Sequence, residues 1–157
     1  MALTRVSKKS DSKPRPRKMK SSENLPEVLY VEDEDLNWEV MFHMLEGDFR
    51  LTRAKNSVEA FEMLENKSFE VVLMDIQLAG SDLSGIEITK LMKGKFNGPI
   101  PTYATPEKNY EAPVIFVTAY AAAYDKKDLI GFGGTDLFFK PVEFPELTQA
   151  IKQLIAN

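Results

Sequence analysis

The chain contains no cysteine, and this absence excludes disulfide bonds, thiolate metal sites and cysteine nucleophiles at once. A reducing cytoplasm is the compartment that we expect for such a sequence. No run of apolar residues is long enough to span a membrane. The basic N-terminus is followed by no apolar segment of the kind that secretory signals contain. We therefore expect a cytoplasmic protein with no membrane partner.

Histidine is almost absent too, and glycine is missing where a common cofactor site needs it. The single histidine, His43, lies off the apolar face of an expected helix, which favours a solvated surface position. An acidic run, residues 32–35, follows the first expected strand, where a dinucleotide-binding enzyme has a glycine-rich turn. The sequence therefore argues against a nicotinamide or flavin enzyme of that type.

The charge of the chain divides it into two parts. At 157 residues, 43% of them hydrophobic and 28% charged, the chain fits one ordinary globular domain with a sizeable core. Residues 1–20 carry eight lysines and arginines and one acid, whereas the remainder carries 12 basic and 23 acidic residues. The net charge of −4 therefore hides an acidic domain, residues 26–157, behind a basic arm.

The basic arm, residues 1–25, is rich in Lys, Arg, Ser and Pro and has few large apolar groups, so we expect it to be disordered. Three interpretations stay open: a solubilising tail, a polyanion-binding arm and a docking peptide. Clusters of Lys and Arg bind nucleic acid through its phosphates, but this arm has no interleaved aromatic residues. We expect at most weak polyanion binding.

Short apolar runs rich in β-branched residues recur along the domain and predict strands buried on both faces, as in parallel sheets. Segments with helical periodicity lie between them, so the sequence predicts a doubly wound α/β fold. The expected strands are residues 27–31, 49–54, 71–75, 114–118 and 137–139. The expected helices are residues 35–46, 58–66, 85–93, 121–130 and 145–155.

Local signals add detail to the first two helices. Ser57 is the expected N-cap of the second helix. In the first helix, five apolar residues have the spacing of a core-facing stripe, namely Leu36, Val40, Met41, Met44 and Leu45.

Residues 94–112 have neither helical nor strand periodicity. Nineteen residues without regular structure is long for a connection in such a fold, so we expect a functional or a mobile loop. Tyr103 and Tyr110 would either pin this loop to the domain or contact a partner.

Four of the apolar runs end in reactive polar side chains, which belong to Glu32 and Asp33, Asp75, Thr118, and Lys140. Ligands of doubly wound folds bind outside the carboxyl ends of the strands, so these side chains should meet there. Three neighbouring carboxylates repel one another and stay ionised together only when a cation joins them. Hard oxygen ligands with room for water and phosphate oxygens indicate Mg²⁺.

This set of residues suits phosphoryl transfer. Asp75 stands alone on its strand and is free to act as a nucleophile toward phosphorus. The metal and Lys140 would neutralise the phosphoryl oxygens, and the hydroxyl of Thr118 would donate a hydrogen bond to one of them. The product would be an aspartyl phosphate. We also expect a cis Lys140–Pro141 peptide bond, which would aim the lysine across the strand ends.

Through these motifs the chain resembles the receiver domain of response regulators in two-component signalling, over about residues 28–155. The family pattern is an acidic pair, a phosphoacceptor aspartate, a threonine or serine and a Lys-Pro pair after successive strands. The resemblance implies a flavodoxin-like (βα)5 three-layer sandwich with strand order 2-1-3-4-5. It also implies that Asp33, Asp75 and the backbone carbonyl of Gln77 bind Mg²⁺ directly, with Glu32 acting through water.

Three features depart from the family pattern. Glu32 stands where many members have Asp, which is harmless for a contact through water. The loop after Asp75 is two residues longer than the common form and has Ala79 where Pro is usual. Leu137 replaces the switch aromatic three residues before the lysine, so the usual coupling of Thr118 to ring rotation cannot operate in its normal form. Phosphorylation should survive, and the output step should differ.

We therefore expect a single-domain response regulator, not an enzyme, that accepts a phosphoryl group on Asp75 from a histidine kinase or phosphotransfer protein. Its signal would pass to a partner through the face of the fourth helix, fifth strand and fifth helix, or onward in a phosphorelay. The alternative is a receiver-fold interaction module that acts independently of phosphate, which Leu137 favours. A related phosphatase is disfavoured because it would want an aspartate where Gln77 stands.

Overall fold

Five parallel strands form a single sheet in the order β2-β1-β3-β4-β5. This computed structural model describes residues 24–105, 109–119 and 123–156. The sheet order is the one predicted, and the short apolar runs form its strands because continuous β-branched sequence suits a sheet covered on both faces. The strands are β1 (Glu27–Val31), β2 (Arg50–Ala54), β3 (Val71–Met74), β4 (Val114–Thr118) and β5 (Asp136–Phe139).

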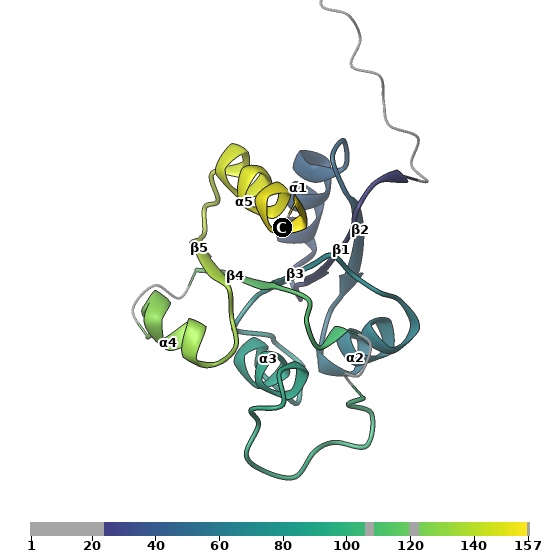
Figure 1. Cartoon of the computed structure of the whole chain (residues 1–157), viewed down its shortest axis with the longest axis vertical. Coiled ribbons are helices and arrows are strands. Elements are labelled where there is room, and N and C mark those ends of the chain that lie inside the picture. Colours follow the sequence, from purple (N-terminus) through teal and green to yellow (C-terminus); the bar gives the residue numbers. More distant parts are fainter. Residues whose placement is uncertain (1–23, 106–108, 120–122, 157) are drawn as a thin grey trace, which may run out of the picture.

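The helices cover the two faces of the sheet and complete the expected three layers (Figure 1). One face carries the first and last helices, and the opposite face carries the three between them. In chain order the helices are α1 (Asp35–Leu45), α2 (Ser57–Asn66), α3 (Gly85–Met92), α4 (Lys126–Gly131) and α5 (Phe144–Ala156). The doubly wound fold predicted from the alternation of strand and helix is confirmed.

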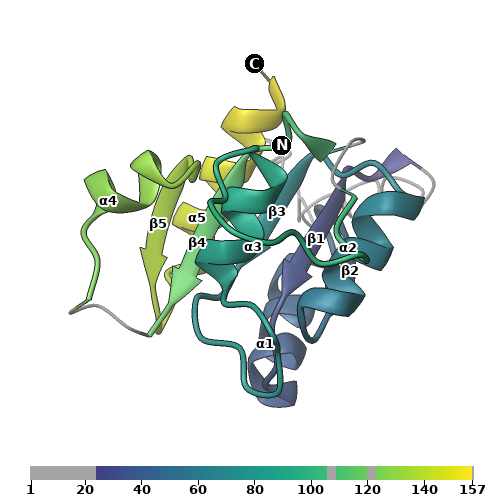
Figure 2. The same cartoon turned by 90° about the horizontal axis from the view of Figure 1, so that it is seen from below.

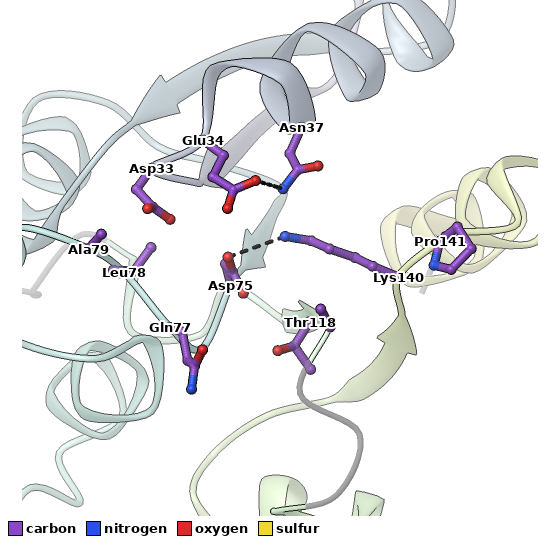
Figure 3. Close-up of a pocket in the computed structure, with 11 residues that line it drawn as sticks. Asp33, Glu34, Asn37, Asp75, Gln77, Leu78, Ala79, Thr118, Lys140 and Pro141 are labelled. Atoms are coloured by element: carbon purple, nitrogen blue, oxygen red, sulfur yellow. Dashed lines mark hydrogen bonds and ion pairs between the residues drawn. The ribbon is translucent and has the colours of Figure 1, made fainter.

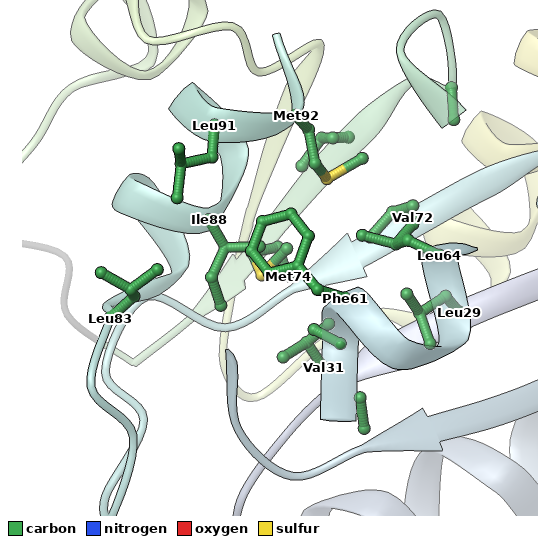
Figure 4. Packing of buried hydrophobic residues seen from close by; sticks show 14 of the residues in the cluster. Leu29, Val31, Phe61, Leu64, Val72, Met74, Leu83, Ile88, Leu91 and Met92 are labelled. Carbon is green, nitrogen blue, oxygen red and sulfur yellow. The ribbon is translucent and has the colours of Figure 1, made fainter. Parts of the chain in front are cut away.

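Alternation along the strands divides the core into two clusters. Leu29, Val31, Val72 and Met74 point to the side of α2 and α3, where Figure 4 shows them packed around Phe61. The residues between them point to the side of α1 and α5, where Tyr30 and Leu73 join Leu147. The central strands β1, β3 and β4 are buried along almost their whole length, so they are packed on both faces and their carboxyl ends are fixed in place.

Two helix starts differ from those predicted. The N-cap of α2 is Asn56, whose side chain accepts a hydrogen bond from the backbone N–H of Glu59, and Ser57 is the first helical residue. Helix α4 begins at Lys126 because Asp125 and Asp128 form a reciprocal capping box. The expected helix over residues 121–130 was therefore too long at its start, and part of that start lies outside the described residues.

The predicted core stripe of α1 is wrong for three of its five residues. Met41 and Leu45 are buried, but Leu36, Val40 and Met44 are 69%, 43% and 52% exposed. These three residues repeat every fourth position and form an exposed apolar stripe beside the buried one. The helix contacts the sheet along a face narrower than its apolar surface, so periodicity alone assigned too many residues to the core.

The unusual loop contacts the domain in parts, whereas its residues 97–100 are exposed. We call residues 94–105 and 109–112 the strap. Figures 1 and 2 show the strap running from α3 toward α2, and in Figure 1 it swings out beyond both helices. Tyr103 reaches the hydroxyl of Ser57 at 3.0 Å, and the ammonium of Lys93 donates to the carbonyls of Tyr110 and Ala112. Tyr103 therefore pins the strap, whereas the ring of Tyr110 is exposed.

Asn109 is the buried anchor of the strap. Its amide nitrogen donates to the carbonyls of Leu64 at 2.7 Å and Lys67 at 2.9 Å, and its amide oxygen accepts from the backbone N–H of Phe69 at 2.8 Å. One side chain thus satisfies three backbone groups at the junction of α2 and β3. This junction would otherwise leave those groups buried without partners.

We predict that Asn109→Ala lowers the free energy of unfolding by roughly 2–4 kcal/mol, because it leaves three backbone groups without their hydrogen-bond partner. Urea unfolding followed by circular dichroism measures the change. Asn97→Ala, at an exposed position of the strap, is the matched control and should leave the midpoint unchanged. An Asn109 variant as stable as the wild type would show that water replaces the side chain without cost.

The basic arm, residues 1–25, lies outside the described residues except for its last two. Within the described part of the chain, no helix has both the length and the apolar character that crossing a bilayer requires.

Candidate functional site

The four predicted strand endings meet in one cleft at the carboxyl edge of the sheet. The cleft has a volume of about 870 Å³ and is lined by Asp33, Asp75, Thr118 and Lys140, together with the loop residues after β3. Figure 3 shows these side chains converging from the ends of β1, β3, β4 and β5, with Gln77 on the rim. The expectation that these side chains meet at the carboxyl edge of the sheet is therefore confirmed.

Backbone hydrogen bonds continue past the strands and fix the residues of the cleft. The N–H of Glu32 donates to the carbonyl of Ala54 at 2.9 Å, and that of Asp75 donates to the carbonyl of Val31 at 3.1 Å. On the other side, the N–H of Lys140 donates to the carbonyl of Thr118 at 2.9 Å. The backbone of each of these residues is thus hydrogen-bonded to a neighbouring strand, so the sheet fixes the positions from which the side chains of the site extend.

Glycine is required beneath the central carboxylate. The N–H of Gly85, the first residue of α3, donates to the carbonyl of Ile76 at 2.9 Å. A Cβ atom at Gly85 would collide with the backbone oxygen of Asp75. The absence of a side chain at Gly85 therefore lets α3 begin directly under the end of β3, where Asp75 stands.

Lys140 bridges two of the carboxylates. Its ammonium lies 2.9 Å from Oε1 of Glu32 and 3.2 Å from Oδ2 of Asp75. Burial lowers the pKa of Lys140, but the hydrogen bond to Glu32 and the charge of Asp75 outweigh it, so the pKa is raised overall. The Lys140–Pro141 peptide bond is cis, as the sequence led us to expect. Lys140 is therefore held charged at the centre of the cleft.

Glu32 is the most constrained acid of the site. Its side chain is fully buried, and its Oε2 has no hydrogen-bond partner among the residues that the structure describes. Burial and the neighbouring Asp75 raise the pKa of Glu32 to about 7, although Lys140 opposes them. A buried carboxylate oxygen without a partner is a group that a bound water or cation would satisfy.

The three acids lie close enough to share one ion. Glu32, Asp33 and Asp75 each offer a carboxylate oxygen, and these oxygens lie within 4.8 Å of one another. Only oxygen ligands are present, the cleft is open to solvent, and one ligand atom lacks a partner. These features fit a hard divalent cation that keeps part of its water shell, such as Mg²⁺.

Sequence reasoning missed some residues of the site. Glu34 and Asn37 line the cleft and are joined by a hydrogen bond of 3.0 Å. Arg53, on β2, donates hydrogen bonds to the loop that carries Glu32 and Asp33. A helix period would have placed Asn37 near the cleft, but nothing in the sequence around Arg53 pairs it with a loop 20 residues earlier.

Comparison with known proteins agrees with this geometry. The model of the family described as response regulator receiver domain matches residues 28–152. The chain belongs to this family. It is 30% identical over 132 residues to the polar-differentiation response regulator DivK of Brucella anthropi, covering 83% of this chain and 96% of the relative. The Brucella ovis protein of the same name matches with the same identity and coverage.

Solved receiver domains share the fold. A receiver domain of a sensor histidine kinase from Pseudomonas aeruginosa PAO1 superposes with a TM-score of 0.69 and 25% identity, covering 85% of this chain and 99% of that one. That structure has a magnesium ion coordinated in its active-site cleft. A Francisella response regulator receiver domain, 21% identical with a TM-score of 0.68, covers 83% of this chain and supports the fold alone.

We predict that the stability of the metal-free protein falls as pH rises from about 4.5 to 7, because of Glu32. Its pKa is raised from 4.5 when unfolded to about 7 when folded, so the folded state binds more protons in that window. Urea unfolding in a chelator at several pH values measures this slope. In Glu32→Gln, the change in the free energy of unfolding between these two pH values should be smaller by roughly 1–3 kcal/mol.

Glu39→Gln, at an exposed position on α1, is the matched control for this experiment. Its pH dependence should equal that of the wild type. If Glu32→Gln and Glu39→Gln have the same slope as the wild type between these pH values, Glu32 ionises in the folded protein without cost, and the prediction is wrong.

Proposed function

We propose that this receiver domain accepts a phosphoryl group on Asp75 from a histidine kinase or histidine phosphotransfer protein and signals through a partner protein in the cytoplasm. The observation that carries the proposal is the cleft itself. Asp75 lies there between the ammonium of Lys140 and a second acid, Asp33, beside the hydroxyl of Thr118. Membership of the receiver family supports the same chemistry.

The proposed step is a substitution at phosphorus. An oxygen of the Asp75 carboxylate attacks the phosphorus of a phosphohistidine, an O–P bond forms and the N–P bond breaks. The electron pair of the broken bond returns to the imidazole nitrogen, which takes up a proton. Lys140 turns from Asp75 to the phosphoryl oxygens and offsets their charge, and Thr118 donates a hydrogen bond to one of them. The chain is thus a phosphoacceptor and not an enzyme with a separate substrate.

Asp33, Asp75 and the backbone carbonyl of Gln77 would hold Mg²⁺, with Glu32 acting through water. The buried Oε2 of Glu32 and the grouping of three carboxylates support this assignment. When bound, the ion supplies positive charge for the phosphoryl oxygens, a role that Lys140 shares. The protein residues carry out the rest: they position the nucleophile and fix the direction of attack.

Asp75→Asn should abolish phosphorylation by acetyl phosphate, since an amide oxygen is a poor nucleophile toward phosphorus. Intact-protein mass spectrometry after incubation with acetyl phosphate, with and without Mg²⁺, measures the reaction. We expect a metal-dependent gain of one phosphoryl group in the wild type and in Asp82→Asn, whose carboxyl is exposed outside the cleft. A phosphorylated Asp75→Asn protein would place the acceptor elsewhere and sink the proposal.

The exposed apolar stripe of α1 is the surface that we assign to the phosphodonor. Leu36 and Val40 line a small groove with Pro141 and Phe144, and this groove borders Lys140. The groove and the cleft that holds Asp75 share Asn37, Lys140 and Pro141, so a protein that brings a histidine to Asp75 can contact both. Exposed apolar side chains next to a reaction site are a typical protein contact surface. The stripe therefore gives a protein donor a contact that a small donor does not need.

Substitution of Leu36 and Val40 by serine should separate the two kinds of donor. We expect phosphorylation by a purified kinase that acts on the wild type to slow by about tenfold, which corresponds to about 1.4 kcal/mol of lost contact energy. The rate with acetyl phosphate should not change. Val58→Ser, an equally exposed apolar position on α2, is the matched control. Equal slowing with both donors would mean that the stripe supports the cleft and does not bind the donor.

The face formed by α4, β5 and α5 is proposed to carry the output. Ile130 and Phe139 expose apolar side chains there. Leu137, which stands at the position of the switch aromatic, is half-buried against the core cluster. The alternative is an interaction module that signals independently of phosphorylation. The Asp75→Asn variant distinguishes the two, because a phosphoacceptor loses signalling in this variant and such a module keeps it.

A further inference from the structure

Arg53 holds the acidic turn between β1 and α1 with three hydrogen bonds. Its Nε donates to the carbonyl of Glu32 at 3.0 Å, and one terminal nitrogen donates to the carbonyl of Asp33 at 3.1 Å. The other terminal nitrogen lies 2.7 Å from the carboxylate of Asp35. The guanidinium fork is thus occupied on all three of its nitrogens, and every partner belongs to one short turn.

The environment of Arg53 makes these contacts strong. Its side chain is only 14% exposed, and its guanidinium lies 5.9 Å from the ring centre of Trp38, the only tryptophan of the chain. The aromatic ring attracts the guanidinium cation, which adds to the hydrogen bonds that keep it in place. The hydrogen bond and charge of Arg53 lower the pKa of Asp35, so this carboxylate stays ionised.

The orientation of the turn gives these contacts a consequence for the cleft. Arg53 donates hydrogen bonds to the backbone carbonyls of Glu32 and Asp33, while the carboxylates of the same two residues lie close to that of Asp75. Without Arg53, those two carbonyls would have to bind water, and the four acids of residues 32–35 would repel one another. The last acid of the turn, Asp35, is held by Arg53 and is not one of the clustered carboxylates.

We infer that Arg53 is a positioning residue for the metal site: it fixes the backbone of the acidic turn so that Glu32 and Asp33 present their carboxylates to a divalent cation. This inference rests on the proposed function, because it assumes that the cleft binds Mg²⁺. When a residue that orients the ligands of a metal through hydrogen bonds is replaced, the affinity for the metal commonly falls by about 10–100-fold.

The sign of the effect distinguishes positioning from charge. Arg53 is a cation next to a cation site, so its charge alone weakens Mg²⁺ binding by repulsion. If Arg53 acted only through its charge, its removal would tighten Mg²⁺ binding. If it acts by holding the turn, its removal weakens binding despite the lost repulsion. The two roles therefore predict opposite changes in the same dissociation constant.

The experiment is a calorimetric Mg²⁺ titration of the wild type, Arg53→Met and Arg53→Lys, with Trp38 fluorescence as a second readout. We expect the dissociation constant to rise about tenfold in Arg53→Met. Arg53→Lys keeps the charge and loses the fork, so it should also bind Mg²⁺ more weakly. In both variants the rate of phosphorylation by acetyl phosphate should return to within about twofold of the wild type at saturating Mg²⁺, because the reacting groups are intact.

Arg50→Met is the matched control. Arg50 lies on the same strand and makes one ion pair with Glu27, at the far end of β1 from the cleft. Its Mg²⁺ affinity should equal that of the wild type, and urea unfolding verifies that each variant is folded.

Two results would overturn the inference, and they differ from each other. Unchanged or tighter Mg²⁺ binding by Arg53→Met, with a wild type that binds Mg²⁺ and is phosphorylated, overturns the role of Arg53 alone. A wild type that neither binds Mg²⁺ nor is phosphorylated overturns the proposed function and the inference with it.

Discussion

The contact on which the site depends is the ammonium of Lys140 placed between the carboxylates of Glu32 and Asp75. Lys140 is 108 positions from Glu32 and 65 positions from Asp75 in the sequence, so only the completed sheet brings them together. Burial of Glu32, together with the neighbouring Asp75, raises the pKa of Glu32, which is the sign of what it costs to keep two acids this close inside the protein. The fold holds the acids there because both faces of the sheet are covered, and the lysine offsets part of the repulsion.

Most of the fold and the members of the site were predictable because their signals are local. A short β-branched run indicates a buried strand, and the polar residue that ends it lies at the sheet edge whatever the distance along the chain. Glu32, Asp33, Asp75, Thr118 and Lys140 could each be located by that rule. The strand order was predictable only through the resemblance to receiver domains, because periodicity carries no information on which strands are neighbours.

The features that sequence reasoning missed all depend on contacts between distant segments. Asn109 is an ordinary loop residue until the strap brings it to the junction of α2 and β3. The exposure of Leu36, Val40 and Met44 follows from the narrow contact of α1 with the sheet, which no helical period reveals. The role of Arg53 was missed for the same reason. An arginine on an edge strand usually points to solvent, and only the path of the β1–α1 turn gives Arg53 its hydrogen-bond partners.

The distribution of restraints around the cleft indicates where a bound phosphoryl group can change the structure. On the side of α2 and α3, the strap, Asn109 and six buried residues of α3 hold the helices to the sheet. On the same face, at its β5 end, α4 is a helix of six residues with one buried member, Leu129. Local opening costs least where few side chains are buried. With Leu137 in place of an aromatic switch, the response to charge at Asp75 should therefore appear as a shift of α4 against β5, not as the rotation of a ring.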